Sequence, residues 1–305
     1  MAIMAHDSER NEHGNDGEHR GKTTDGNGVR GSDGNTSTSK TIGHNGRNEL
    51  LQRIIPPTIT VVALLAVWQL AANGGLVSAA TLASPTQIVG SMAATWGELM
   101  SAAAVTTGEA LTGFVISIVL GIALGVGLHV SRTVHSALYP LLVAAQTIPI
   151  ITIAPLFMIW FGFSPVGKIV LVAVFGVFSI VIDTSRGLDA VPRFYEDVAL
   201  TCGATKPWAL FHVKLRVAAR QIFSGIRISA AYVFGTAVTA EYLGATNGLG
   251  VWLQAAFNSF QTPMIFSAAI VVVAETGLLL GFVALVERVM LGPASEESST
   301  SFDQS

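Results

Sequence analysis

Six apolar stretches, each long enough to cross a lipid bilayer as a helix, alternate with polar segments along the chain. A crossing of this kind needs about 20 predominantly apolar residues. The stretches cover residues 55–73, 109–130, 137–161, 166–184, 222–243 and 264–286. This pattern predicts an all-α, polytopic membrane protein with six transmembrane helices.

Three prolines interrupt the third stretch, at Pro140, Pro149 and Pro155. Each proline removes a backbone donor, and at membrane depth this is tolerated only where neighbouring protein or a water-filled cavity satisfies the freed carbonyl groups. We therefore expect the third span to lie inside a helix bundle.

Two segments between the spans predict short interfacial helices on the outer side of the membrane. In residues 83–100, Ser84 and Pro85 are placed as the N-cap and the first helical residue. Between the fifth and sixth spans, a glycine-rich turn precedes a short helix that carries Trp252 and Phe257. Aromatic side chains of this kind favour the membrane–water interface.

The composition agrees with a membrane protein, because 50% of the 305 residues are hydrophobic and only 12% are charged. Residues 1–46 are almost devoid of apolar side chains and predict a disordered cytoplasmic tail. Residues 47–292 form the predicted transmembrane domain, and residues 293–305 a second disordered tail. The basic residues do not form aromatic-interleaved patches, so no nucleic acid is expected as a partner.

The basic residues gather on one side of the predicted membrane domain. Short loops rich in Lys and Arg stay on the cytoplasmic side. With six spans, that side holds Arg47, Arg53, Arg132, Arg186, Arg193, Lys206, Lys214, Arg216, Arg220 and Arg288. The opposite side has only Lys168, in the short turn before the fourth span. We therefore predict a multi-pass protein of the cell membrane with both termini in the cytoplasm.

The longest polar interruption lies between the fourth and fifth spans, at about residues 187–220. Pro192 suits a helix start and Gly203 a helix end, which predicts two short helices there. A packed helix pair moves as a unit and is suited to transmitting the motion of a soluble partner. The alternative is a plain solvated loop.

This loop resembles the signature of the inner-membrane permeases of ATP-binding-cassette (ABC) importers. The signature reads Glu-Ala-Ala, three residues, Gly, nine residues, then Ile, any residue, Leu-Pro. At the same spacing this chain has Asp197, Val198, Ala199, Gly203, Val213, Lys214, Leu215 and Arg216. Four positions depart from the signature. Three of these replacements, Asp for Glu, Val for the first Ala and Val for Ile, keep the sign of the charge or the shape of the side chain. The fourth, Arg216 in place of proline, concerns the bend where the loop re-enters the membrane.

The resemblance covers about residues 50–290. The segments ASPTQIV, QTIPIITIAPLFMIWFGFSP and AEYLGATNGLG are similar to a subgroup that carries nitrate, sulfonates, taurine and pyrimidine precursors of thiamine. Nitrate, an alkylsulfonate, taurine, riboflavin-like and pyrimidine compounds all remain open as substrates, and the third span favours a pyrimidine precursor. The resemblance implies the type I ABC importer permease architecture, with a second permease copy that is generally identical. It also implies cytoplasmic ATPase subunits and an extracytoplasmic substrate-binding protein.

By the same resemblance, the polar loop docks into a groove on the ATPase. The residues assigned to this coupling loop are Asp197, Val198, Ala199, Gly203, Lys206 and Leu215. Asp197, Ala199 and Gly203 would allow close helix approach, and Lys206 and Arg193 are candidates for polar contacts.

ATP hydrolysis is expected on a separate subunit, which would bind ATP and Mg²⁺. We expect no catalytic residues, cofactor or metal in this chain. The segment GEHRGKT resembles a phosphate-binding loop, but it has three residues between its glycines instead of four. An ion-coupled secondary transporter is the alternative function, although such carriers typically show an internal repeat, which is not evident here.

Polar side chains at membrane depth are costly unless they are paired or face water, so each is a candidate for the translocation path. Glu275 lies near the middle of the sixth span, where it either faces a cavity or joins two spans by a hydrogen bond. Glu241 either lines the path or lies at the interface as a helix-end carboxylate. Gln146, Thr147 and Thr152 either contact a polar substrate or bond neighbouring helices.

Smaller patterns predict helix contacts. Gly121, Gly125 and Gly127 are expected to permit close packing of the second span. Asp183 and Arg186, three positions apart at the inner end of the fourth span, are expected to pair on one helix face.

Overall fold

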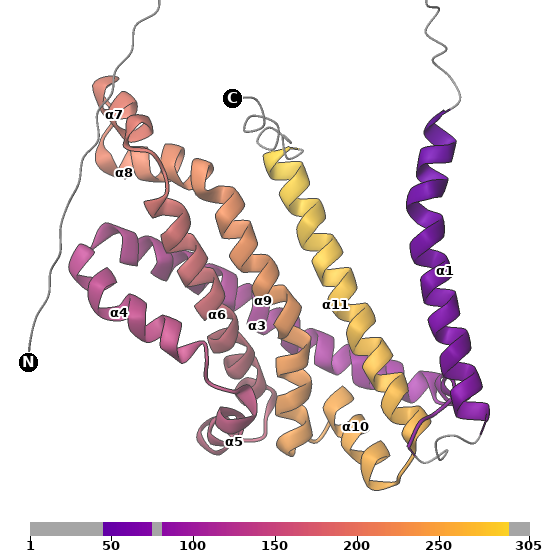
Figure 1. Ribbon diagram of the computed structural model, residues 1–305. Helices are drawn as coiled ribbons and strands as arrows, with labels where there is room; N and C mark the ends of the chain where they lie inside the picture. Colours follow the sequence, from indigo (N-terminus) through magenta and orange to yellow (C-terminus); the bar gives the residue numbers. More distant parts are fainter. Residues whose placement is uncertain (1–44, 75–80, 293–305) are drawn as a thin grey trace, which may run out of the picture. The chain divides into compact units, whose positions relative to one another are not determined.

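The computed structural model describes residues 45–74 and 81–292, and every regular element in these ranges is a helix (Figure 1). The helices are α1 (Asn45–Asn73), α2 (Pro85–Ala94), α3 (Trp96–Val130), α4 (Arg132–Ala145), α5 (Ile150–Phe161), α6 (Pro165–Asp189), α7 (Arg193–Thr201), α8 (Lys206–Ala209), the π-helix η1 (Leu210–Lys214), α9 (Leu215–Gly244), α10 (Leu249–Asn258) and α11 (Thr262–Leu291). The predicted tails lie outside the described residues, except that residues 45–46 begin α1. The all-α prediction is confirmed.

The chain divides into two compact units, residues 1–55 and 56–305. The described part of the first unit is the beginning of α1. In the second unit, the last turns of α1 contact the segment that leads into α2, where the Trp68 indole donates to the Ala83 carbonyl at 3.1 Å. Trp68 also packs against Phe266 of α11 with 5.5 Å between the ring centroids.

Four helices in the described residues are long and apolar enough to cross a membrane: α3, α6, the continuous helix from α8 through α9, and α11. The pair α4 and α5 makes a fifth if it counts as one bent span, and α1 contributes a shorter apolar stretch, Ile59–Asn73. The described residues therefore hold four or five candidate spans, and the count of six stays a prediction.

The third predicted span is not one helix. It is broken between Gln146 and Pro149, and α4 and α5 are bent by 103° relative to each other. Pro149 stands as the N-cap of α5 with extended backbone, and it also biases Ile148 away from the helical conformation. The other two prolines lie inside α4 and α5 and leave each of them helical.

The helix of the second predicted span is longer than its apolar stretch. It begins at Trp96 instead of Glu109 and runs for 35 residues, or about 52 Å at 1.5 Å per residue. Immediately before it, α2 begins as predicted. Ser84 caps the helix, and its side chain and that of Gln87 form a capping box.

Small residues hold α3 against α6 in a regular register. A Cβ atom on Gly121 would lie 2.6 Å from the Cβ of Ile180, and one on Gly125 would meet Thr184 equally closely. Gly113 faces Val172 in the same way, so contacts recur at intervals of four or eight residues on both helices. Gly127 was expected in this seam, but nothing lies within 4 Å of its position, so that prediction is wrong.

α6 packs between α3 and α9, and α11 packs on the far side of α9. The main apolar core lies among these four helices and includes Phe114, Ile180, Phe234 and Val283. Figure 1 shows α7 and α8 at one end of α6 and α9, and α5 and α10 at the other. The candidate functional residues therefore fall at two opposite ends of one helix bundle.

Candidate functional site

The loop between α6 and α9 folds as the two short helices that Pro192 and Gly203 predict. Pro192 is the N-cap of α7, and Gly203 follows its C-terminus with φ +89°. The amide of Ala204 donates to the Ala199 carbonyl at 3.0 Å, and that of Gly203 donates to Leu200 at 3.0 Å. These two hydrogen bonds end α7, and the left-handed backbone conformation that they require at residue 203 favours glycine.

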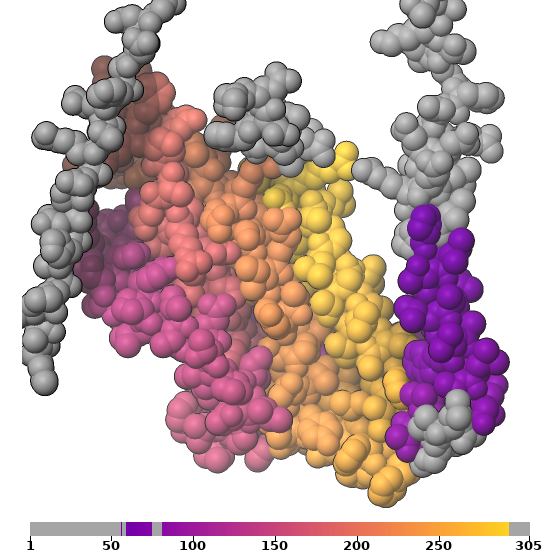
Figure 2. Space-filling view, viewed as in Figure 1, coloured from indigo at the N-terminus to yellow at the C-terminus, as the bar shows by residue number. Residues whose placement is uncertain are grey.

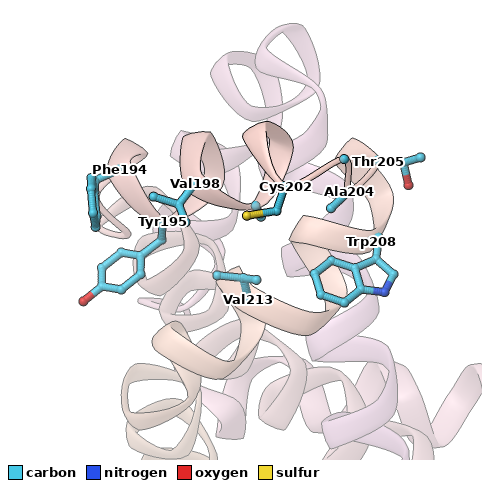
Figure 3. A pocket seen from close by; sticks show the side chains of 10 residues that line it. Phe194, Tyr195, Val198, Cys202, Ala204, Thr205, Trp208 and Val213 are labelled. Carbon is cyan, nitrogen blue, oxygen red and sulfur yellow. The ribbon is translucent and has the colours of Figure 1, made fainter.

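A groove of about 680 Å³ opens between α7 and α8 (Figure 3). Its lining residues are Phe194, Tyr195, Val198, Ala199, Cys202, Gly203, Ala204, Thr205, Trp208 and Val213. We call it the loop groove. The side chains of Phe194 and Trp208 are large and apolar, yet 70% and 48% exposed. An apolar patch of this kind on a folded surface marks an interaction site.

The six residues assigned to the coupling loop separate onto different faces. Val198, Ala199 and Gly203 line the loop groove. Asp197 and Lys206 line a second, polar cavity on the other side of α7. Leu215 packs against the apolar core at the start of α9 and faces neither cavity.

The loop re-enters the membrane domain without a break. The residue at the signature's proline position is Arg216, and the chain passes from α8 through the π-helix η1 into α9 as one continuous helix, Lys206–Gly244. A proline there would disrupt such a helix, whereas arginine is a good helix former.

The polar cavity, of about 710 Å³, holds a chain of interactions that the sequence patterns did not indicate. His129 Nδ1 lies 2.6 Å from Asp189 Oδ1, and His129 Nε2 lies 2.9 Å from Lys214 Nζ. Lys214 Nζ also donates to Glu196 Oε2 at 3.2 Å. These four residues, the loop relay, come from α3, α6, η1 and α7. They are up to 85 positions apart in sequence, so no local spacing connects them.

At the opposite end of the bundle, Glu241 is completely buried. Its Oε2 accepts a hydrogen bond from the Gly250 amide at 2.8 Å, and the Thr106 hydroxyl donates to the same carboxylate at 2.9 Å. Thr106 in turn accepts from the Leu249 amide at 2.8 Å. Together they bind the free amides at the N-terminus of α10, where a negative charge is favourable.

Lys168 completes this cluster. It was expected in the short turn between the third and fourth spans, but it lies in the first turn of α6, and only 3% of its side chain is exposed. Its Nζ is 2.6 Å from Glu109 Oε2 and 4.0 Å from Glu241 Oε1. The cluster Thr106, Glu109, Lys168 and Glu241, the carboxylate clamp, joins α3, α6, α9 and α10.

Of the two alternatives for Glu275, a cavity-facing group or a hydrogen bond between spans, the structure shows the hydrogen bond. The Thr107 hydroxyl of α3 donates to Glu275 Oε1 of α11 at 2.8 Å. Gln146, Thr147 and Thr152 lie on the surface of the chain, at the break between α4 and α5 and in the first turn of α5.

The expected pair of Asp183 and Arg186 does not form. Arg186 Nε donates to the Tyr139 hydroxyl of α4 at 2.6 Å, whereas Asp183 is buried against Gly225 of α9. The two side chains lie on different faces of α6 because one faces α9 and the other faces α4. A pair that the sequence patterns did not indicate forms between helices, where Arg227 of α9 lies 3.2 Å from Glu287 of α11.

Residues 117–293 match the family of binding-protein-dependent transport system inner membrane components. This stretch is more than half of the chain. The chain belongs to this family of ABC importer permeases. The ion-coupled secondary transporter is therefore set aside, and the chain is the non-catalytic, membrane-embedded subunit of its transporter.

Relatives of the chain extend the match beyond that stretch. It is 32% identical to the formylaminopyrimidine transport permease protein ThiX of Halalkalibacterium halodurans, over 78% of this chain and 95% of that protein. It is 29% identical to the taurine transport system permease protein TauC of Escherichia coli, over 75% of this chain and 86% of that protein.

The fold is also that of solved importers. A chain from an inward-facing structure of the MetNI methionine ABC transporter superposes with a TM-score of 0.56 and 18% identity, over 64% of this chain and 97% of that chain. The type I importer permease fold predicted from the sequence is confirmed, although the number of spans is not.

Proposed function

We propose that this permease couples a cytoplasmic ATPase, docked on the loop groove, to a translocation path for a small polar solute that a binding protein delivers. The observation that carries the proposal is the groove itself. It presents exposed aromatic side chains on the packed helices α7 and α8. It also contains the Val198, Ala199 and Gly203 positions of the family signature. In this arrangement ATP and Mg²⁺ belong to the ATPase.

The rigid shape of the loop supports docking. Gly203 leaves the surface beside Cys202 free of a side chain, and nothing lies within 4 Å of its missing Cβ. A helix of the partner can therefore approach the backbone closely. Exposed aromatic anchors at the centre of such a site supply most of the binding energy in protein interfaces.

Charge distribution supports a cytoplasmic position for this end of the bundle. Basic residues are concentrated around the loop, and they include Arg132, Arg193 and Lys206 at the polar cavity. Lys168, the one cation at the opposite end among residues 81–292, is neutralised in the carboxylate clamp and does not lie in a loop. The loops at this end therefore carry the Lys and Arg residues, and the loops at the other end carry none in the described chain, which is the distribution that keeps short basic loops in the cytoplasm. With α1 as the first of six spans, both termini are cytoplasmic.

For the translocation path, we favour the break between α4 and α5. Irregular backbone at membrane depth is tolerated where it is buried in protein or lines a water-filled cavity. Gln146, Thr147 and Thr152 are exposed there on the single chain. A second copy of the permease facing this surface would enclose them. Glu241 and Glu275 are engaged within one chain, so they are weaker candidates for substrate contact.

For the substrate, we propose a pyrimidine precursor of thiamine. The support is the match to a formylaminopyrimidine permease over 95% of its length, together with the likeness of the third span. Nitrate, sulfonates, taurine and riboflavin-like compounds are the competing classes. Mass spectrometry of the small molecule bound to the co-purified binding protein decides among them. A pyrimidine supports the assignment, and any other ligand replaces it.

The docking proposal is tested by purifying the tagged chain from its native membrane, as wild type and as Gly203→Asp. We expect an ATPase and a binding protein to accompany the wild type, and the ATPase to be lost from the variant. The matched control is Thr133→Asp, which places the same charge on an exposed residue in the first turn of α4, outside the loop groove. Loss of the ATPase from both variants, or retention in both, contradicts docking at the loop groove.

A further inference from the structure

The loop relay is the one charged connection between α7 and the ends of the membrane helices in the part of the chain that the structure describes. Glu196 is the only charged side chain of α7 with an ion pair there, and its partner is Lys214. Arg193 and Asp197, on the same helix, form no ion pair within the described residues. Glu196 is therefore the residue through which α7 is joined by an ion pair to the segment that leads into α9.

Hydrogen-bond chemistry gives the relay a single arrangement. The Lys214 ammonium can only donate, so His129 Nε2 must accept from it. The ring proton then lies on Nδ1 and is donated to Asp189 at 2.6 Å. This tautomer follows from the network of partners. A neutral His129 thus joins a cation on η1 to a carboxylate at the end of α6.

The attachment of α7 to the bundle is otherwise sparse. Ala199 is the only buried residue of α7. The face that includes Phe194 and Val198 is turned to the loop groove and lies exposed. Just outside the helix, Val191 is buried in the apolar core. The helix is therefore held at its two ends by apolar contacts and in its first turn by Glu196.

The segment that carries Lys214 is a π-helix, Leu210–Lys214. Such wide turns are rare and frequently occur at functional sites. Lys214 is the last residue of η1, directly before α9 begins. If the α7–α8 pair rotates relative to α9, the backbone of η1 is the segment that has to change conformation.

We propose that the loop relay transmits the displacement of α7 to the ends of α3 and α6, and that Glu196, Lys214 and His129 are positioning residues of the transport cycle. This inference rests on the docking of an ATPase at the loop groove. It adds a specific route: motion passes from the docked face of α7 through Glu196 to Lys214, and from there through His129 to Asp189.

The test uses the intact complex of permease, ATPase and binding protein, with a reporter cysteine at the end of α3. Val130→Cys is suitable because Val130 is exposed and lies next to His129 at the polar cavity. The rate of maleimide labelling at position 130 is measured with and without a non-hydrolysable ATP analogue. Peptide mass spectrometry separates this label from the one on Cys202.

We expect the nucleotide to change the labelling rate by about fivefold or more in the otherwise wild-type complex, the lower range of common coupling effects. Lys214→Gln should reduce that change below about twofold while the ATPase stays bound and active. Arg216→Gln is the matched control. It removes a cation two positions away that has no ion pair in the described chain, and it should leave the response intact.

Glu196→Gln serves as a second variant, because Glu196 is partly exposed and its replacement leaves the His129–Asp189 bond in place. The relay is overturned if the nucleotide has no effect at position 130, or if the response survives both Lys214→Gln and Glu196→Gln. The proposed function is tested by a different result: it is wrong if no ATPase accompanies the purified wild-type chain.

Discussion

The carboxylate clamp and the loop relay are two charged clusters of similar size at opposite ends of the same helices, yet their surroundings differ. In the clamp, the side chains of Lys168 and Glu241 are 3% and 0% exposed. In the relay, those of Lys214 and Asp189 are 14% and 47% exposed. A buried charge that loses its partner has no water to replace it, whereas a partly exposed one is readily resolvated.

This difference suits the two clusters to different tasks. The clamp binds the N-terminus of α10 and fixes four helices together, so it is expected to persist in every state of the transport cycle. The relay can exchange its contacts for water at small cost in free energy, so it can rearrange when α7 moves. The following variants test that contrast, from the largest expected effect to the smallest.

Replacing Lys168 by Met should cause the largest loss of stability. It leaves Glu109 and Glu241 buried without their cation, and breaking a buried pair in this way costs about 3–5 kcal/mol. The thermal unfolding midpoint in detergent measures the effect. Lys206→Met is the control on the exposed loop and should leave the midpoint unchanged. Equal midpoints for the two variants would contradict the clamp.

Gly248→Ala should destabilise the same end of the bundle by about 2–3 kcal/mol, because left-handed strain alone costs about 1–3 kcal/mol. Gly248 has φ +120°, and a Cβ there would overlap the Glu241 carboxylate. Limited proteolysis near α10 is the measurement, and we expect faster cleavage in the variant. The control is Gly90→Ala on α2, where nothing lies within 4 Å.

The glycine seam between α3 and α6 offers a matched pair. Gly125→Ala introduces a methyl group in close contact with Thr184 and should destabilise by about 1–3 kcal/mol. Gly127→Ala, two residues along the same helix, meets nothing and should stabilise by up to about 1 kcal/mol. Thermal unfolding of the two variants should shift in opposite directions. Shifts of the same sign and size would show that α3 does not pack as described.

Glu196→Gln in the relay should have the smallest effect on stability, less than about 1 kcal/mol, since partly exposed ion pairs contribute little and are screened by salt. We expect the unfolding midpoints of this variant and the wild type to converge as salt is raised. A loss as large as that of Lys168→Met would remove the contrast between the two clusters.

Local sequence signals predicted the local structure well. The Ser84 cap, the helix start after Pro192 and the helix end at Gly203 each depend on residues within one turn of chain, and all three are present. The family signature likewise located the loop. The 103° bend at Pro149 was foreseen only as an interruption, because the angle is set by how α5 packs on α6 and α9.

The paired side chains could not be predicted in the same way. Asp183 and Arg186 are close in sequence but face different helices. Lys168 and Glu241, and likewise His129 and Lys214, come together only when the helices pack. The sequence pattern shows which residues are polar but not which residues of other helices they contact. Polar residues near the ends of the spans were therefore predicted to lie in loops or along the translocation path.

The most direct test of the central claim uses Cys202, the single cysteine of the chain, which is exposed in the loop groove. A membrane-impermeant maleimide is applied to inside-out vesicles, first stripped of peripheral proteins and then with the ATPase restored. We predict rapid labelling of Cys202 after stripping and strong protection once the ATPase is bound. Labelling only in right-side-out vesicles would contradict the orientation, and labelling unchanged by the bound ATPase would contradict docking at the loop groove.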